Sequence, residues 1–156
     1  MKILEFLHEQ AVACELKAQS KDGIIRELVE LLVRAGAVKD KDVDTIIDIL
    51  KNREALGSTG IGQGVAIPHG KTNAVAQLVG AFGVSRAGVD FASLDGTPAH
   101  LFFLLIAPED SAGPHLKALA RISRLLKERH LRDHLKQARD EKVILKMFAD
   151  EDQKRH

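Results

Sequence analysis

Apolar residues recur with helical spacing through the first third of the chain. Residues 22–35 form a pattern with one apolar face, preceded by Ser20 as an N-cap and followed by Gly36 as a C-terminal stop. The apolar positions of this stretch are Ile24, Ile25, Leu28, Leu31, Leu32 and Ala35. Residues 40–53 repeat the pattern. We therefore expect two consecutive amphipathic helices at the start of the fold.

The middle of the chain changes to strand-like runs separated by glycines. The predicted strands are residues 65–67, 78–84, 89–91 and 101–106. The last of these, Leu-Phe-Phe-Leu-Leu-Ile, is apolar without interruption, which is typical of a strand buried on both faces of a sheet. Pro68 favours an extended conformation for the residue before it. The Asp95-Gly96 pair indicates a turn, so the run before it is expected to be an edge strand or a hairpin arm.

The last third of the chain returns to helical periodicity. Residues 116–126 carry an apolar stripe opposite a basic face, and shorter helices are predicted for residues 131–137 and 141–148. Helices, then strands, then helices again predict an α/β fold, a three-layer α/β/α sandwich with a mixed central sheet of about four to five strands. Because no long linker or internal repeat divides the chain, residues 1–156 are expected to form a single domain.

Charge and cysteine content argue against several classes of protein. The chain has 23 Lys and Arg against 22 Asp and Glu, a net charge of +1, whereas nucleic-acid and anionic-membrane binders usually carry a strong basic excess. Cys14 is the one cysteine and cannot form an internal disulfide; we expect it to be a small buried hydrophobe. No apolar run approaches the length of a membrane span or forms a signal-peptide core. We therefore expect a cytoplasmic protein that binds no nucleic acid and inserts into no membrane.

The segment with the most chemical information runs from Gly57 to Lys71, Gly-Ser-Thr-Gly-Ile-Gly-Gln-Gly-Val-Ala-Ile-Pro-His-Gly-Lys. Its glycines are one residue out of register with the dinucleotide-binding pattern G-x-G-x-x-G. The nucleotide P-loop pattern requires a glycine where Val65 stands. A proline and a histidine inside the loop also disfavour a nucleotide cradle. Neither nucleotide motif fits this segment.

His69 is the candidate reactive group of this segment. It stands between Pro68, which fixes the backbone, and Gly70, which allows close backbone approach. A neutral imidazole on such a stiff turn can carry a phosphoryl group on one nitrogen while a hydrogen bond orients the other. Glycine amides nearby can form an anion-binding concavity. A structural histidine in a tight turn is the alternative, and it fits the spacing equally well.

Residues 53–71 as a whole, which begin with Arg-Glu-Ala-Leu before the glycine segment, resemble the active-site signature of the fructose/mannitol type of enzyme IIA. These proteins are phosphocarriers of the bacterial phosphoenolpyruvate-dependent phosphotransferase system. The resemblance extends to the two leading helices, to the strand at residues 101–106 and to the helix near His115. It is strongest for the nitrogen-regulatory branch, on the segments Lys-Asp-Gly-Ile-Ile-Arg-Glu-Leu and Leu-Leu-Ile-Ala-Pro-Glu. We expect the chain to act without a fused IIB or IIC domain.

The resemblance implies that His69 accepts a phosphoryl group, at Nε2, from a phosphohistidine on an HPr-like carrier protein. It assigns phosphate stabilisation to His115 and to Arg53, although an arginine at a helix C-terminus is otherwise usually a solvated charge. The candidates for phosphate binding in the glycine segment are Gly70, Gly64 and Thr59. Positioning and charge stabilisation suffice for transfer between histidines, so no cofactor and no metal is expected.

The position of His115 supports its assignment. It follows Gly113-Pro114, and because proline is favoured at the first helical position, we expect His115 in the first turn of a helix. The positive end of the helix dipole suits an anion, and a ring N–H there can donate to a phosphoryl group. Spacing alone favours a partly exposed histidine that only begins the helix; the resemblance favours the functional role.

The function implied is a phosphohistidine phosphocarrier that acts in nitrogen or metabolic regulation through its phosphorylation state and binds regulatory target proteins. One alternative is a sugar-transport enzyme IIA that passes phosphate to a separate IIB component. Another is a non-catalytic regulatory domain of the same fold, against which the presence of His69, Arg53 and His115 argues.

A second pair of histidines, His130 and His134, has the four-residue helical spacing that can bind a metal. The metalloprotease pattern H-E-x-x-H is absent, because leucine follows the first histidine. Three neighbouring cations favour a solvated basic face instead: Arg129, Arg132 and Lys136. The histidines without any chemical context are His8, His100 and His156.

Overall fold

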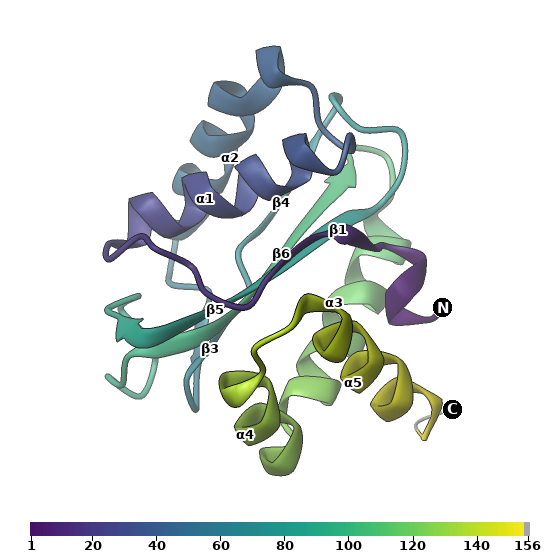
Figure 1. Cartoon of the computed structure of the whole chain (residues 1–156). Coiled ribbons are helices and arrows are strands. Elements are labelled where there is room, and N and C mark those ends of the chain that lie inside the picture. Colours follow the sequence, from purple (N-terminus) through teal and green to yellow (C-terminus); the bar gives the residue numbers. More distant parts are fainter. Residues whose placement is uncertain (155–156) are drawn as a thin grey trace.

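The fold, a computed structural model that describes residues 1–154, has one strand at its start, followed by two helical blocks with the remaining strands between them (Figure 1). The strands are β1 (Leu7–Ala13), β2 (Gly60–Gly62), β3 (Val65–Ala66), β4 (His69–Thr72), β5 (Val79–Val89) and β6 (Ala99–Pro108). The helices are α1 (Lys21–Arg34), α2 (Val43–Ala55), α3 (Ala112–Leu126), α4 (Arg129–Gln137) and α5 (Glu141–Gln153). Short 3-10 helices at Ile3–Glu5 and Asp40–Asp42 precede β1 and α2. Residues 155 and 156 of the predicted domain, including His156, lie outside the described residues.

The strands form one mixed sheet in the order β1-β5-β6-β3-β2, in which β4 also pairs with β6, further along the edge that β3 occupies. β5 and β6 are antiparallel, whereas β1 runs parallel to β5 and both β3 and β4 run parallel to β6. The expected three-layer α/β/α arrangement with a mixed sheet is confirmed. The sheet has six strands rather than four to five, because β1 and the short strands β2 and β4 were not predicted.

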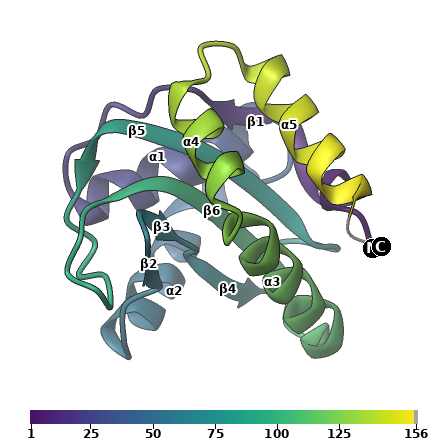
Figure 2. The same cartoon turned by 90° about the horizontal axis from the view of Figure 1, so that it is seen from below.

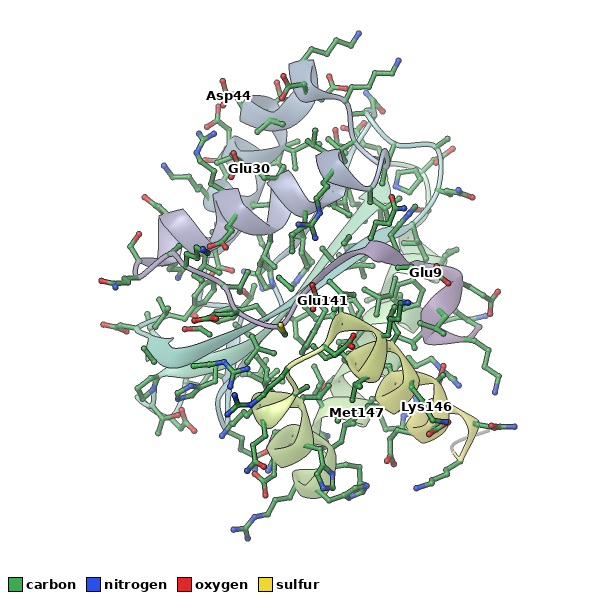
Figure 3. All side chains as sticks on the ribbon, in the orientation of Figure 1. Glu9, Glu30, Asp44, Glu141, Lys146 and Met147 are labelled. Carbon is green, nitrogen blue, oxygen red and sulfur yellow. The ribbon has the colours of Figure 1, made fainter. Side chains whose placement is uncertain are left out.

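Helices cover both faces of the sheet. α1 and α2 lie on one face, and α3, α4 and α5 lie on the other (Figures 1 and 2). As its uninterrupted apolar sequence predicts, β6 is buried on both sides: Phe102 and Leu104 belong to the core under α1 and α2, and Phe103 belongs to the core under the other helices. Figure 3 labels two exposed residues of these opposite layers, Glu30 on α1 and Lys146 on α5.

The helices lie where the sequence predicts them, but the starts of α2 and α3 and the end of α5 differ from the predicted bounds. The hydroxyl of Ser20 accepts a hydrogen bond from the Gly23 amide at 3.1 Å, so the predicted N-cap of α1 is confirmed. The second helix begins at Val43, because the three residues before it form a 3-10 helix. The last helix extends to Gln153 instead of residue 148. Among residues 1–154, no helix has both the length and the apolar character needed to cross a membrane.

Of the two alternatives for residues 89–91, a separate edge strand is wrong, and a hairpin arm is confirmed only at Val89, which pairs with Ala99 of the antiparallel strand β6. Val89 is the last residue of β5, whose pairing with β6 shifts register between Val84 and Val89. Phe91 is fully buried, but it lies in the loop that follows. The turn expected at Asp95-Gly96 is present: the Gly96 amide donates to the Ser93 carbonyl at 3.0 Å, and Gly96 has a φ of +74°.

Candidate active site

His69 is the first residue of β4 and lies in register with Leu105 of β6. The sequence predicted a turn after one strand; the structure instead has two strands, β3 and β4, on either side of Ile67 and Pro68. The carbonyl of Pro68, which has no N–H to donate, accepts a hydrogen bond from the Leu105 amide at 3.0 Å. The backbone of the histidine is therefore held by the sheet rather than by a free turn.

A main-chain hydrogen bond fixes the His69 ring. Its Nδ1 lies 2.8 Å from the carbonyl oxygen of Ile67. Because a carbonyl oxygen only accepts, Nδ1 carries the proton and Nε2 has the free lone pair. Burial lowers the pKa of His69 and the charge of Arg53 lowers it too, against the opposing effects of the Ile67 hydrogen bond and of Glu54. The neutral ring with a free Nε2 is the form that a nucleophile requires.

His115 lies beside His69, and the two rings meet edge to face with their centroids 5.5 Å apart. Only 6% of His115 is exposed. Burial, with smaller contributions from His69 and Lys71, lowers the pKa of His115 to about 4. Its Nε2 is buried and has no hydrogen-bond partner in the part of the chain that the structure describes. Leaving a buried polar atom unpaired costs about 1–3 kcal/mol, so this nitrogen calls for a functional explanation.

The start of α3 differs from the prediction. Pro114 is the third residue of the helix rather than the first, and His115 is the fourth. The amide of His115 donates to the carbonyl of Ser111 at 2.9 Å. His115 can therefore offer an anion its side chain but not its main-chain N–H.

Arg53 lies in the last turn of α2, as predicted. Its Nη1 donates to the carbonyl of Gly57 at 2.7 Å, a contact that closes the C-terminal end of the helix. The guanidinium has further N–H donors, and its charge acts on the pKa of His69. The structure thus brings the arginine and the predicted nucleophile into one electrostatic environment.

Gly70 follows His69 on β4. A Cβ atom at this position would lie 2.9 Å from Cγ2 of Ile49, so the glycine allows α2 to approach the strand closely. Side chains alternate along a strand. The side chains of His69 and Lys71 therefore project to the opposite face of the sheet, where α3 carries His115.

The other two candidates of the glycine segment lie elsewhere. Thr59 is 4% exposed, and its amide and hydroxyl both donate to the carboxylate of Glu54. The carbonyl of Gly64 accepts a hydrogen bond from the amide of Leu101 on β6. Leu101 comes four residues before Leu105, the residue of β6 that lies in register with His69. At about 3.3 Å per residue, this places Gly64 roughly 13 Å from His69 along the sheet. Of the three, only Gly70 adjoins the predicted nucleophile.

Two charged residues of this site were not singled out from the sequence. Lys71 shares a strand face with His69, and its charge contributes to the low pKa of His115. Strand alternation from His69 was the signal that could have identified it. Glu54 is the second, and its ion pair with Lys21 at 2.8 Å joins the two leading helices. No local sequence pattern indicates that pair.

The second histidine pair lies on α4, where the ring centroids of His130 and His134 are 6.4 Å apart. Both residues are exposed. Nε2 of His130 lies 2.9 Å from a carboxylate oxygen of Glu151, and Nδ1 lies 3.7 Å from Glu128. Glu128, His130 and Glu151 each place one potential metal-ligand atom within 4.8 Å of the others. His134 is not part of that group.

Cys14 is half-buried rather than buried. Burial raises the pKa of its thiol, and the side chain of Glu141, at the start of α5 in Figure 3, raises it further. A raised pKa keeps the sulfur protonated and unreactive. The expected burial is therefore found only in part, and a packing role for this cysteine stays a prediction.

Comparison with known proteins assigns the family. Residues 5–151 match the family model described as phosphoenolpyruvate-dependent sugar phosphotransferase system, EIIA 2. A fructose-specific EIIABC component of the phosphotransferase system from Bacillus subtilis is 40% identical over 97% of this chain, which spans 24% of that protein. A nitrogen regulatory protein from Bradyrhizobium diazoefficiens is 38% identical, over 96% of this chain and 95% of that protein.

A solved structure supports the same assignment. The crystal structure of nitrogen regulatory protein IIA-Ntr from Neisseria meningitidis superposes with a TM-score of 0.82 and 34% sequence identity. The match covers 92% of this chain and 97% of that one. The similarity to the nitrogen-regulatory branch is confirmed, together with a similarity to fructose-specific relatives. The chain therefore belongs to the EIIA type 2 family of the phosphoenolpyruvate-dependent sugar phosphotransferase system.

Proposed function

We propose that this chain is a phosphocarrier in which Nε2 of His69 accepts a phosphoryl group from a phosphohistidine of an HPr-like protein. The paired histidines carry the proposal. The bond from Nδ1 of His69 to Ile67 leaves Nε2 with its lone pair, and the buried, unpaired Nε2 of His115 lies on the neighbouring ring. Membership in a phosphotransferase family supports this chemistry.

The proposed step balances without proton transfer between the proteins. The Nε2 lone pair of His69 forms the new N–P bond while the N–P bond of the carrier's phosphohistidine breaks. The carrier's imidazole leaves with the electron pair of that bond. Nδ1 of His69 keeps its proton and continues to donate it in a hydrogen bond to the Ile67 carbonyl oxygen. Transfer through a loose, metaphosphate-like transition state needs mainly positioning and stabilisation of charge on the phosphoryl oxygens.

His115, Arg53 and Lys71 supply that stabilisation in this proposal. A pKa of about 4 keeps His115 neutral at pH 7, so its single ring proton, placed on Nε2, donates to a phosphoryl oxygen. The two cations act on the histidine pair from α2 and β4. Gly70 contributes backbone next to the nucleophile. We assign Thr59 and Gly64 to the shape of the loop rather than to phosphate contact.

Regulation through phosphorylation is the role that we propose for the carrier. A phosphoryl group adds negative charge and acceptor oxygens at one place on the surface. The free and phosphorylated forms then bind regulatory target proteins differently. Relatives named nitrogen regulatory protein that match nearly end to end support this role. We place the relay in the cytoplasm, as expected from the sequence.

Onward transfer to a IIB component is the second candidate. The relative from Bacillus subtilis, which is named a fructose-specific EIIABC component, favours it. The two roles share the step at His69 and differ in what the phosphorylated form does next. A non-catalytic regulatory domain would lack that step altogether.

Reconstitution tests the shared step. The chain is incubated with phosphoenolpyruvate, enzyme I and an HPr-type carrier, and the protein-bound label is analysed for stability. We expect a label that is labile in acid and stable in alkali, as is typical of phosphohistidine. Omitting the carrier is the control and should leave the chain unlabelled. No label in the complete mixture would refute the phosphocarrier role, and subsequent loss of label to an added IIB protein would favour transport.

A further inference from the structure

Glu54 is a buried carboxylate at the end of α2. Its side chain is 6% exposed, and Oε1 lies 2.8 Å from Nζ of Lys21, the first residue of α1. The same ammonium lies 3.4 Å from the carbonyl oxygen of Phe91 and 4.8 Å from the centre of that ring. Burying a carboxylate is costly unless it is paired and hydrogen-bonded. The Lys21 ammonium contacts the carboxylate, the Phe91 carbonyl and the Phe91 ring, and these three contacts fix the position of Glu54.

From this position Glu54 holds Thr59 at two atoms. The Thr59 amide lies 3.1 and 3.3 Å from the two carboxylate oxygens, and the Thr59 hydroxyl donates to Oε2. The carbonyl of Thr59 in turn accepts a hydrogen bond from the amide of Ile67 at 3.0 Å. The hydrogen bonds that fix Thr59 to the Glu54 carboxylate therefore also fix the segment that leads into β4.

Ile67 completes the connection. Its carbonyl oxygen is the atom that accepts from Nδ1 of His69 at 2.8 Å. Pro68 follows and restricts the conformation of Ile67. An unbroken series of hydrogen bonds therefore runs from Lys21 through Glu54, Thr59 and Ile67 to the ring of the proposed nucleophile.

We propose that Glu54 is a positioning residue for His69. Through Thr59 and Ile67 it holds the carbonyl that keeps the proton on Nδ1, and so keeps Nε2 unprotonated and correctly directed. Its effect on rate rests on the proposed phosphocarrier function. Its effect on the tautomer of His69 does not, because the tautomer exists in the unphosphorylated protein.

Two substitutions test this inference at different points of the series. Glu54→Gln removes the negative charge that is paired with Lys21. Thr59→Val removes only the hydroxyl group that donates a hydrogen bond to Glu54. Nitrogen-15 NMR of the imidazoles reports the tautomer. In the wild-type protein Nδ1 of His69 should give a protonated signal and Nε2 an unprotonated one. Both variants should shift these signals toward each other and speed exchange of the Nδ1 proton with water, and Thr59→Ser should restore the wild-type spectrum.

The rate gives a second readout. Because both substituted side chains are buried, KM for the phosphorylated carrier should stay within about twofold, while the rate of phosphoryl transfer falls about tenfold to hundredfold from misalignment of the nucleophile. Thr59→Ser should recover most of the rate that Thr59→Val loses. If Glu54 and Thr59 only stabilised the loop, the substitutions would lower the thermal stability. They would leave the His69 tautomer unchanged and would not lower the transfer rate at constant KM.

A matched control is available on the same two helices. Asp22 of α1 and Lys51 of α2 form an ion pair at 3.6 Å, but both side chains are largely exposed, at 69% and 47%. Asp22→Asn and Lys51→Met should change neither the His69 spectrum nor the transfer rate, as expected for a surface pair.

The outcomes separate the inference from the proposed function. Folded Glu54→Gln and Thr59→Val proteins with the wild-type tautomer and rate would overturn the positioning role. If Glu54→Gln does not fold, the comparison of Thr59→Val with Thr59→Ser decides the question. If the wild-type protein accepts no phosphoryl group, the phosphocarrier function fails, and the NMR spectra still decide whether Glu54 fixes the ring.

Discussion

Within residues 1–154, two pairs of histidine rings meet edge to face, and their surroundings differ. His69 and His115 come from a strand and a helix far apart in the sequence, and their centroids are 5.5 Å apart. His130 and His134 occupy one turn of α4, with centroids 6.4 Å apart. The contact geometry is similar. Burial and hydrogen bonding are what separate the pairs.

The first pair leaves one ring nitrogen unused. Nε2 of His115 is buried without a partner among the described residues, and Nδ1 of His69 is bonded so that Nε2 retains its lone pair. In the second pair, His130 is exposed and contacts the carboxylates of Glu128 and Glu151. An accessible histidine that is already paired gains little from a new ligand, whereas a buried unpaired one gains a hydrogen bond.

The charged partners of the two pairs also differ. Arg53 and Glu54 act on His69, and Lys71 acts on His115. His130 instead contacts two carboxylates, those of Glu128 and Glu151. The cations beside the first pair favour an anion such as a phosphoryl group, whereas the carboxylates in contact with His130 disfavour one. Only the second pair is visible from the sequence as a pair, because its four-residue interval needs no fold, whereas the first pair forms through tertiary structure.

Replacing one histidine from each pair should give the largest contrast. His69→Ala removes the proposed acceptor and should abolish phosphorylation by the HPr-type carrier, whereas His134→Ala should be labelled like the wild-type protein. Incorporation of radioactive phosphate from phosphoenolpyruvate measures both. Residual acid-labile label on a folded His69→Ala protein would show that another residue accepts the phosphoryl group.

The pH dependence of stability should reveal the burial of His115. Its pKa is about 4 in the fold and about 6.5 in an unfolded chain. Between these values the unfolded chain binds a proton that the folded protein does not, so stability is lost as the pH falls through this window. His115→Gln should reduce the loss of unfolding free energy between pH 7 and pH 4 by up to about 3 kcal/mol.

Urea unfolding at both pH values measures this effect. His134→Gln, at an exposed position, is the matched control and should leave the pH dependence close to that of the wild-type protein. Equal acid sensitivity in the wild-type and His115→Gln proteins would mean that His115 does not have a lowered pKa in the fold.

Removing the donor without the nucleophile should have an intermediate effect on rate. His115→Ala should still be labelled at His69, about a hundredfold more slowly, because one hydrogen-bond donor to the developing charge is lost. Rapid-quench measurements with a phosphorylated carrier give the rate. Labelling at the wild-type rate would exclude a catalytic role for His115, and label on a folded His69→Ala protein at His115 would reverse the two assignments.

Arg53→Ala should have the smallest effect of these changes. Loss of one charge-assisted hydrogen bond should slow transfer about tenfold. The fold should be retained, because Arg53 is half-buried and its side chain donates to a loop carbonyl, that of Gly57. The thermal unfolding midpoint serves as the control. An unchanged transfer rate would remove Arg53 from the phosphate site.

Local sequence signals account for the parts that were predicted. Ser20 marks the start of α1 because a hydroxyl caps free amides, and the apolar run of β6 predicts a strand buried on both faces. Pro68 and Gly70 make His69 a candidate, and the resemblance of residues 53–71 to the enzyme IIA signature favours the reactive role over the structural one. Each of these features depends on residues that lie close to one another in the sequence.

The features that were missed depend on the tertiary structure. β1 was not predicted because Glu9 and two other polar residues interrupt it; β1 ends the sheet order, and Glu9 is exposed there. Gly64 is near His69 in sequence, but the path through β3 carries it along the sheet. The Lys21–Glu54 pair joins two helices, and nothing in either local sequence indicates the other partner.

The position of the phosphoryl group within the protein tests the central claim most directly. Nitrogen-15 and phosphorus-31 NMR of the phosphorylated chain identifies the nitrogen bonded to phosphorus. We predict a bond to Nε2 of His69, with Nδ1 still protonated and donating to the carbonyl of Ile67. A phosphoryl group on Nδ1 of His69, or on His115 or either histidine of α4, would contradict the account.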